Sequence, residues 1–88
     1  MLLAKMYYEL NEQSALDNLL LSFKVYIHRH KELGYHKTNY LNFLKFTKRL
    51  TTVNFYDKSA LEKLATRIKN EQYLVERKWL LERVNLLG

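Results

Sequence analysis

Apolar side chains recur along this chain three and four residues apart, which is the spacing of helices that bury one face. The first stripe, at Leu3, Met6 and Leu10, predicts a short helix over residues 1–10. After a polar turn, a second stripe predicts a helix over residues 14–33. The apolar positions of this second helix are Leu16, Leu19, Leu20, Phe23, Tyr26 and Ile27. The pattern therefore predicts that the chain opens with a helical hairpin.

Both ends of the second helix carry recognisable signals. Ser14 is a candidate N-cap, and Asp17 lies three residues on as its capping-box partner. Gly34 follows the last turn, where a residue in the left-handed conformation commonly ends a helix. We therefore expect the second helix to start at Ser14 and to end against Gly34.

The second half of the chain predicts two or three more helices. A third helix begins between His36 and Thr38 and fades at residues 51–53, whose β-branched side chains are weaker helix formers. Asp57 is a suitable N-cap for a fourth helix. The apolar stripe of that helix then breaks, so either the helix kinks near Asn70 or Asn70 caps a fifth helix. We favour the cap.

The predicted fold class is all-α, with four to five antiparallel helices in a single domain over residues 1–88. No alternating strand pattern competes with this assignment. The first helix is apolar from its start, and the last helix ends in two leucines at 86 and 87 with no polar residue between them. We expect these terminal helices to pack against further helical repeats or a second copy, as in a fragment of a longer solenoid.

Residues 2–27, LLAKMYYELNEQSALDNLLLSFKVYI, resemble a helical hairpin of the tetratricopeptide class. The chain as a whole resembles the C-terminal helical region of longer bacterial tetratricopeptide-like proteins of uncharacterised function. This resemblance implies a small right-handed superhelix of paired helices and a role in protein–protein interaction or scaffolding. The pairs that would pack between the two helices are Leu3, Ala4 and Tyr7 against Ala15, Leu19 and Phe23.

The positive charge is concentrated in one segment. The net charge is +6, and residues 24–49 contain seven Lys or Arg against Glu32 alone, whereas the rest of the chain has eight residues of each sign. Such a field attracts polyanions or an acidic protein surface. The alternative is a solvated basic surface that only keeps the protein in solution.

We expect the basic segment to bind an acidic protein partner. In this interpretation Asn42 bonds the partner's backbone amides and Arg49 takes a carboxylate in bidentate fashion. The candidate partner-binding residues are Lys24, His28, Lys31, Asn42, Lys45, Phe46 and Arg49.

Nucleic-acid binding through residues 24–49 is the alternative function. Phe46 is predicted to lie on a polar, positive side of the third helix, where a base could stack on its ring. Cations on both sides would then contact the phosphates. These cations are Lys24, Lys31, Lys45 and Arg49.

The three histidines do not predict a metal site. His28 and His30 are two residues apart, so on a helix their side chains point about 200° apart, and chelating pairs need i, i+4 spacing. His30 is instead expected to be a packed or helix-terminal histidine, as cations in the last turn favour the helix dipole. The chain has no cysteine, and we expect no metal and no cofactor.

Catalysis and membrane insertion are not expected either. The serines and aspartates are explained by helix starts or mid-helix positions, and no glycine-rich phosphate loop is present. The N-terminus is interrupted by Lys5 and Glu9 too early for a signal peptide, and no apolar run approaches the ~18 residues of a membrane span. Cytoplasm is therefore the default expectation for the protein's location.

Overall fold

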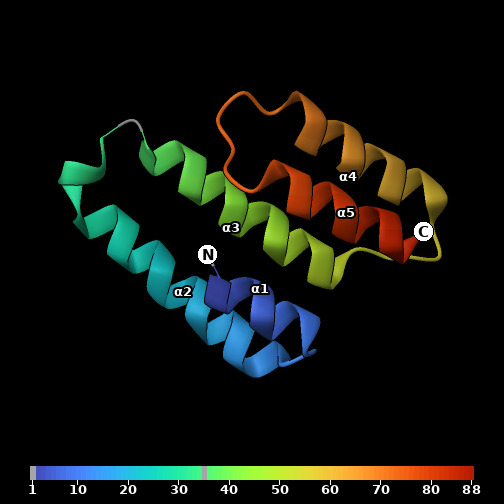
Figure 1. The fold of residues 1–88 in the computed structure, drawn as a ribbon, viewed down its shortest axis with the longest axis horizontal. Helices are drawn as coiled ribbons and strands as arrows, with labels where there is room; N and C mark the ends of the chain where they lie inside the picture. The colour runs from blue at the N-terminus through green and yellow to red at the C-terminus, as the bar shows by residue number, and fades with distance from the viewer. Residues whose placement is uncertain (1, 35) are drawn as a thin grey trace.

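The computed structural model describes residues 2–34 and 36–88, and in these residues it contains five α-helices, one 3₁₀ turn and no strand (Figure 1). The all-α prediction is therefore confirmed. The helices are α1 (Leu2–Glu9), α2 (Gln13–Arg29), α3 (His36–Thr52), α4 (Lys58–Asn70) and α5 (Arg77–Leu87), with the 3₁₀ turn η1 (Lys31–Leu33) between α2 and α3.

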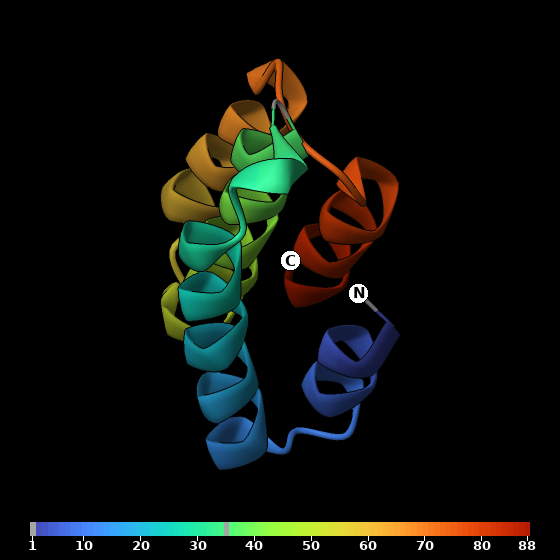
Figure 2. The same cartoon turned by 90° about the vertical axis from the view of Figure 1, so that its left-hand side faces the viewer.

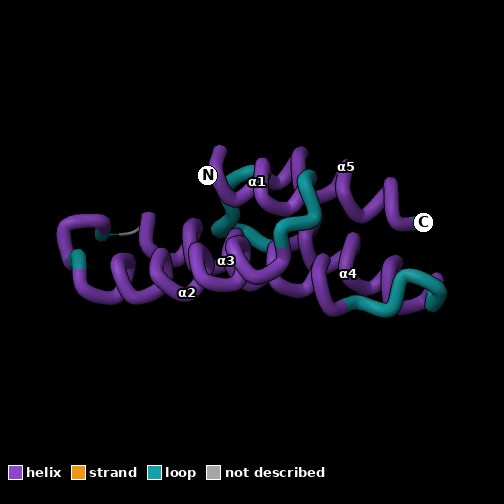
Figure 3. The backbone as a smooth tube through the Cα atoms, turned by 90° about the horizontal axis from the view of Figure 1, so that it is seen from below, coloured by secondary structure: helices purple, strands orange, loops and turns teal. Residues whose placement is uncertain are grey.

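The helices form two layers. Helices α2, α3 and α4 lie side by side, and α1 and α5 cover one face of that layer (Figures 2 and 3). Helix α3 is central, since it packs against both α2 and α5. The two terminal helices lie on the same face of the layer, although the start of α1 and the end of α5 are well separated (Figure 1).

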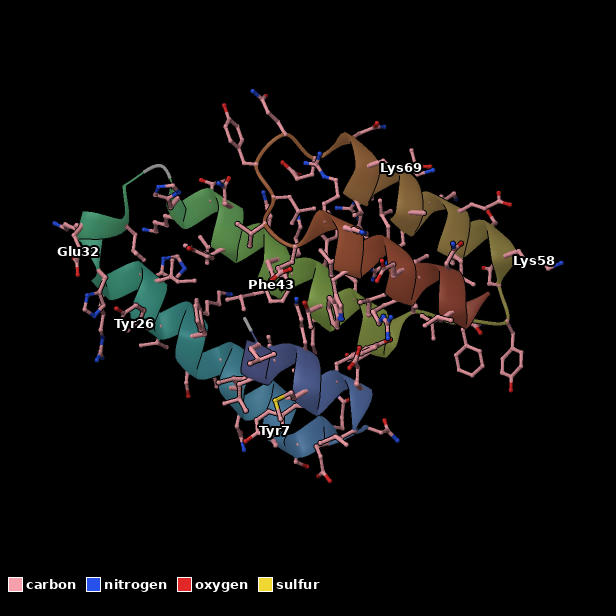
Figure 4. All side chains as sticks on the ribbon, viewed as in Figure 1. Tyr7, Tyr26, Glu32, Phe43, Lys58 and Lys69 are labelled. Carbon is pink, nitrogen blue, oxygen red and sulfur yellow. The ribbon has the colours of Figure 1, made fainter. Side chains whose placement is uncertain are left out.

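The core lies between the two layers, with Phe43 of α3 near its centre (Figure 4). Its ring is 0% exposed and lies 6.1 Å from the Trp79 ring of α5, measured between centroids. Tyr8 of α1 meets the same indole edge-on at 5.5 Å. A single cluster of buried side chains thus joins residues from all five helices.

Polar contacts join α1 to α5. Glu9 Oε1 accepts hydrogen bonds from Arg83 at 2.9 Å and from Trp79 Nε1 at 3.3 Å. Lys5 forms an ion pair with Glu76 at 3.0 Å. Part of α1 nevertheless remains exposed, and so does Leu86 near the end of α5. That these terminal helices contact further repeats or a second copy stays a prediction.

The prediction that Ser14 caps α2 is wrong. The helix begins one residue earlier, at Gln13, because Asn11 adopts a left-handed backbone with φ 58° and turns the chain sharply. Ser14 therefore lies inside the first turn. Asp17 accepts a hydrogen bond from Gln13 Nε2 at 2.9 Å instead of serving as a capping-box partner.

Helix α2 ends at Arg29, earlier than predicted, and the chain continues through η1 to Gly34. Gly34 does have the positive φ that was expected, at 55°, but its ψ of −131° lies in a region that only glycine adopts readily. Its N–H bonds the carbonyl of Lys31, so it ends the 3₁₀ turn rather than α2.

A fifth helix exists, but Asn70 does not cap it. Asn70 is the last residue of α4, whose final hydrogen bond runs from Glu71 N–H to the carbonyl of Arg67. Residues 71–76 form a loop in which Leu74 packs on the core, so this apolar side chain belongs to the loop and not to a helix. Glu76, in the left-handed conformation, precedes α5.

Asp57 caps α4 as predicted, because its carboxylate accepts a hydrogen bond from Ala60 N–H at 3.2 Å. We expect Asp57→Ala to lower the free energy of unfolding by about 1 kcal/mol in urea titrations. Asp57→Asn, which keeps the capping oxygen, should cost clearly less. Equal losses in the two variants would show that the cap does not stabilise this helix.

No helix in the described part of the chain is long and apolar enough to cross a membrane.

Candidate functional site

A groove of about 650 Å³ runs between α2 and α3. Leu20 and Leu44, both buried, lie at its base, and Leu21 and Leu41 add apolar surface to its two walls. The polar lining residues are Asp17, Lys24, His28, Asn42, Lys45, Lys48 and Arg49. The groove therefore combines an apolar interior with an excess of positive charge.

The groove opens on the uncovered face of the helical layer. On α3, Phe43 points toward Trp79 and thus toward α5. Lys45 is two residues further along, so it points about 200° away, toward the opposite face. Because α1 and α5 both lie on the Phe43 side, neither of them covers the groove (Figure 2).

Five of the predicted partner-binding residues line this groove: Lys24, His28, Asn42, Lys45 and Arg49. They come from two helices and are brought together because α2 and α3 pack side by side. Lys31 does not join them, since it lies in η1 and is exposed outside the groove.

Phe46 does not lie on the surface, which corrects its predicted place on a polar face. The side chain is 1% exposed. Lys45 Nζ lies 4.9 Å from the centroid of its ring, and the guanidinium of Arg67 on α4 lies 6.0 Å away. The neighbouring helix thus supplies a side chain that covers the ring. Phe46 belongs to the core and cannot stack on a base.

The leucines of the groove were missed as site residues. Leu21 is 64% exposed, and a signal for it exists in the run Leu19, Leu20, Leu21. Successive helix positions point about 100° apart, so three consecutive leucines cannot all face one core. The exposed one could have been suspected of lying at a binding surface.

Asp17 and Lys48 link the two walls of the groove. Their ion pair measures 2.8 Å between Oδ1 and Nζ. The hydrogen bond from Lys48 is the main reason that the pKa of Asp17 falls below its usual value, because it stabilises the ionised carboxylate. Asp17 is the one carboxylate among the described groove residues.

The other groove cations are not neutralised in this way. Within residues 2–34 and 36–88, no carboxylate lies within ion-pair distance of Lys24, Lys45 or Arg49. Their charges are therefore available to a ligand.

Asn42 has a structural contact at the edge of the groove. Its Nδ2 donates a hydrogen bond of 2.8 Å to the carbonyl of Tyr73, which ties the loop between α4 and α5 to α3. This contact occupies part of the amide that was expected to bond a partner's backbone.

The histidines are distributed over different environments. His28 lines the groove, whereas His30 follows the last residue of α2, stacks on Tyr26 at 3.9 Å between centroids and contacts Glu32 at 2.5 Å. His30 is thus a packed, helix-terminal residue, as expected. In the part of the chain that the structure describes, no three His, Asp or Glu side chains converge as metal ligands.

The chain matches no family model, no curated protein and no solved structure. Its class is therefore defined by the fold itself, as an all-α protein of five helices in the described residues. The resemblance of its first hairpin to tetratricopeptide repeats stays a prediction.

Proposed function

We propose that this protein is a non-catalytic helical interaction module whose groove between α2 and α3 binds an acidic segment of a protein partner. The observation that carries the proposal is the group of three cations, Lys24, Lys45 and Arg49, that surround an apolar groove and have no carboxylate partner within residues 2–34 and 36–88. Charge of one sign steers an oppositely charged partner, and burial of apolar surface then stabilises the complex.

The apolar lining favours a protein ligand over a nucleic acid. Proteins that hold single-stranded nucleic acid place exposed aromatic rings along a basic channel. Phe46, the ring expected to play this part, is buried, and the groove lining described here consists of leucines and polar residues. Leucine side chains suit the aliphatic side chains of a protein.

The titratable groups support a binding role rather than catalysis. In the described residues the lowered pKa values of Asp17 and Glu32 have ion-pair causes, namely hydrogen bonds from Lys48 and His30. A catalytic acid or base usually needs a pKa shifted toward neutrality in a closed cleft. Carboxylates that are kept ionised by hydrogen bonds from neighbouring side chains do not have that character.

Fluorescence anisotropy tests the proposal. We expect a labelled peptide rich in Glu and Leu to bind at micromolar concentration at ~50 mM salt and more weakly at ~200 mM, because salt screens the groove cations. The same peptide with every Glu replaced by Lys should not bind. A labelled oligo(dT) is titrated in parallel. If the acidic peptide fails to bind, or if oligo(dT) binds more tightly with a steep salt dependence, the proposal is wrong.

A further inference from the structure

We infer that the groove accepts an amphipathic acidic helix, which presents an apolar stripe to the leucines and carboxylates on both sides of that stripe. This inference rests on the proposed function, since it specifies the partner segment that the same groove binds. It follows from three features of the groove: its walls, its charges and its uncovered face.

The two walls of the groove are helices, and their backbone groups are not free to bind an extended ligand. The carbonyl and N–H groups in the middle of α2 and α3 are engaged in their own helical hydrogen bonds. An extended peptide lying on this surface would have no backbone partners, and its buried peptide groups would remain unsatisfied. A helix satisfies its own backbone before it binds. Asn42, the amide in the groove, already donates to Tyr73.

The polar groups of the groove match such a helix in position. On α3, the cations Lys45 and Arg49 are four residues apart, and on α2 the imidazole of His28, which can hydrogen-bond a carboxylate, lies four residues after the cation Lys24. Each pair therefore spans about 6 Å along its helix, close to one helical turn. A ligand helix with Glu at i, i+4 on each side of its apolar stripe places carboxylates at the same interval.

The groove already accommodates one carboxylate. Asp17 Oδ1 lies 2.8 Å from Lys48 Nζ across the two walls. Lys45 and Arg49 lie on the same side of α3 as Lys48 and have no such partner among the described residues. Carboxylates of the ligand would extend along α3 the contact that Asp17 makes at one end.

A second copy of this chain does not fit the groove. None of the five helices carries more acidic than basic residues, and α3 alone contributes four basic residues and no acidic one. Two copies, each with a net charge of +6, would place like charges together. The occupant is therefore a helix of a different, acidic protein.

Two labelled peptides of identical Leu, Glu and Ala composition test the inference. One has Leu at i, i+3, i+4 and i+7 with Glu on both flanks, and the other alternates Leu and Glu, so it has no apolar helical face. We expect the first to bind at least about tenfold more tightly. Its circular dichroism should become more helical on binding, and a central Ala→Pro change should abolish that gain.

The outcomes separate this inference from the proposed function. Equal affinity of the two peptides, or tighter binding of the alternating one, would show that the ligand does not bind as a helix. The proposal that the groove binds an acidic ligand would still stand. If neither peptide binds, the proposed function fails as well. Trp79 is buried on the other side of α3, so its unchanged emission serves as the control that the protein remains folded during the titration.

Discussion

Replacing Phe46 by alanine is expected to lower the free energy of unfolding by about 3 to 5 kcal/mol, because the ring is fully buried and its removal leaves a cavity. A chain of 88 residues has a total free energy of unfolding of roughly 4 to 13 kcal/mol, so the variant should lose much of its stability. Urea titration followed by circular dichroism measures the change.

Phe55 supplies the matched control, because Phe55→Ala removes the same atoms from a side chain that is 48% exposed in the loop between α3 and α4. Its loss should stay below about 1 kcal/mol. If Phe46→Ala instead kept its stability and lost affinity for a labelled oligonucleotide, the ring would be at a binding surface after all, and the nucleic-acid alternative would gain support.

The double variant Lys45→Glu, Arg49→Glu is expected to weaken binding of the acidic helical peptide by roughly 10- to 100-fold at low salt. Both side chains are exposed cations of the groove without a carboxylate partner in the described residues, so reversal replaces attraction by repulsion. Folding should persist, since neither position is part of the core. Anisotropy titrations at two salt concentrations give the affinities.

The control for this variant must change the net charge by the same amount elsewhere. Lys63→Glu, Lys78→Glu reverses two exposed lysines on α4 and α5, outside the groove lining, and also lowers the net charge from +6 to +2. We expect only a small loss of affinity from this pair. Equal losses in the two double variants would mean that overall charge, and not the groove, attracts the acidic ligand.

The sequence predicted the helices better than their ends. The i, i+3, i+4 stripes placed the first four helices because amphipathic periodicity is a local property of the chain, and they favoured a fifth helix whose start at Asn70 was wrong. Asp57 was identified as a cap for the same reason, since its bond reaches only three residues ahead. Ser14 and Asn70 were misassigned because the adjoining turns depend on left-handed residues, Asn11 and Glu76, which composition does not reveal.

The candidate site was predictable in its charge but not in its shape. Residues 24–49 hold the whole positive excess of the chain, and five of the seven proposed residues do line one groove. Phe46 was predicted to lie on the polar face because its burial depends on Arg67 of α4, which is about twenty residues away in sequence. The run of three leucines at 19–21 already indicated that one of them is exposed, but the place of Leu21 in a groove depends on α3 packing beside α2.

The sequence by itself determined the all-α class, the approximate positions of the first four helices and the concentration of positive charge, because each of these depends on neighbours within a few residues. The tertiary structure decided which face of each helix is covered. Helices α1 and α5 pack on the Phe43 side of α3 and leave the Lys45 side open. Which face is covered depends on contacts between segments that are distant in sequence, such as the hydrogen bond between Glu9 and Arg83. These contacts form only when the whole chain folds, so a local sequence pattern does not contain them.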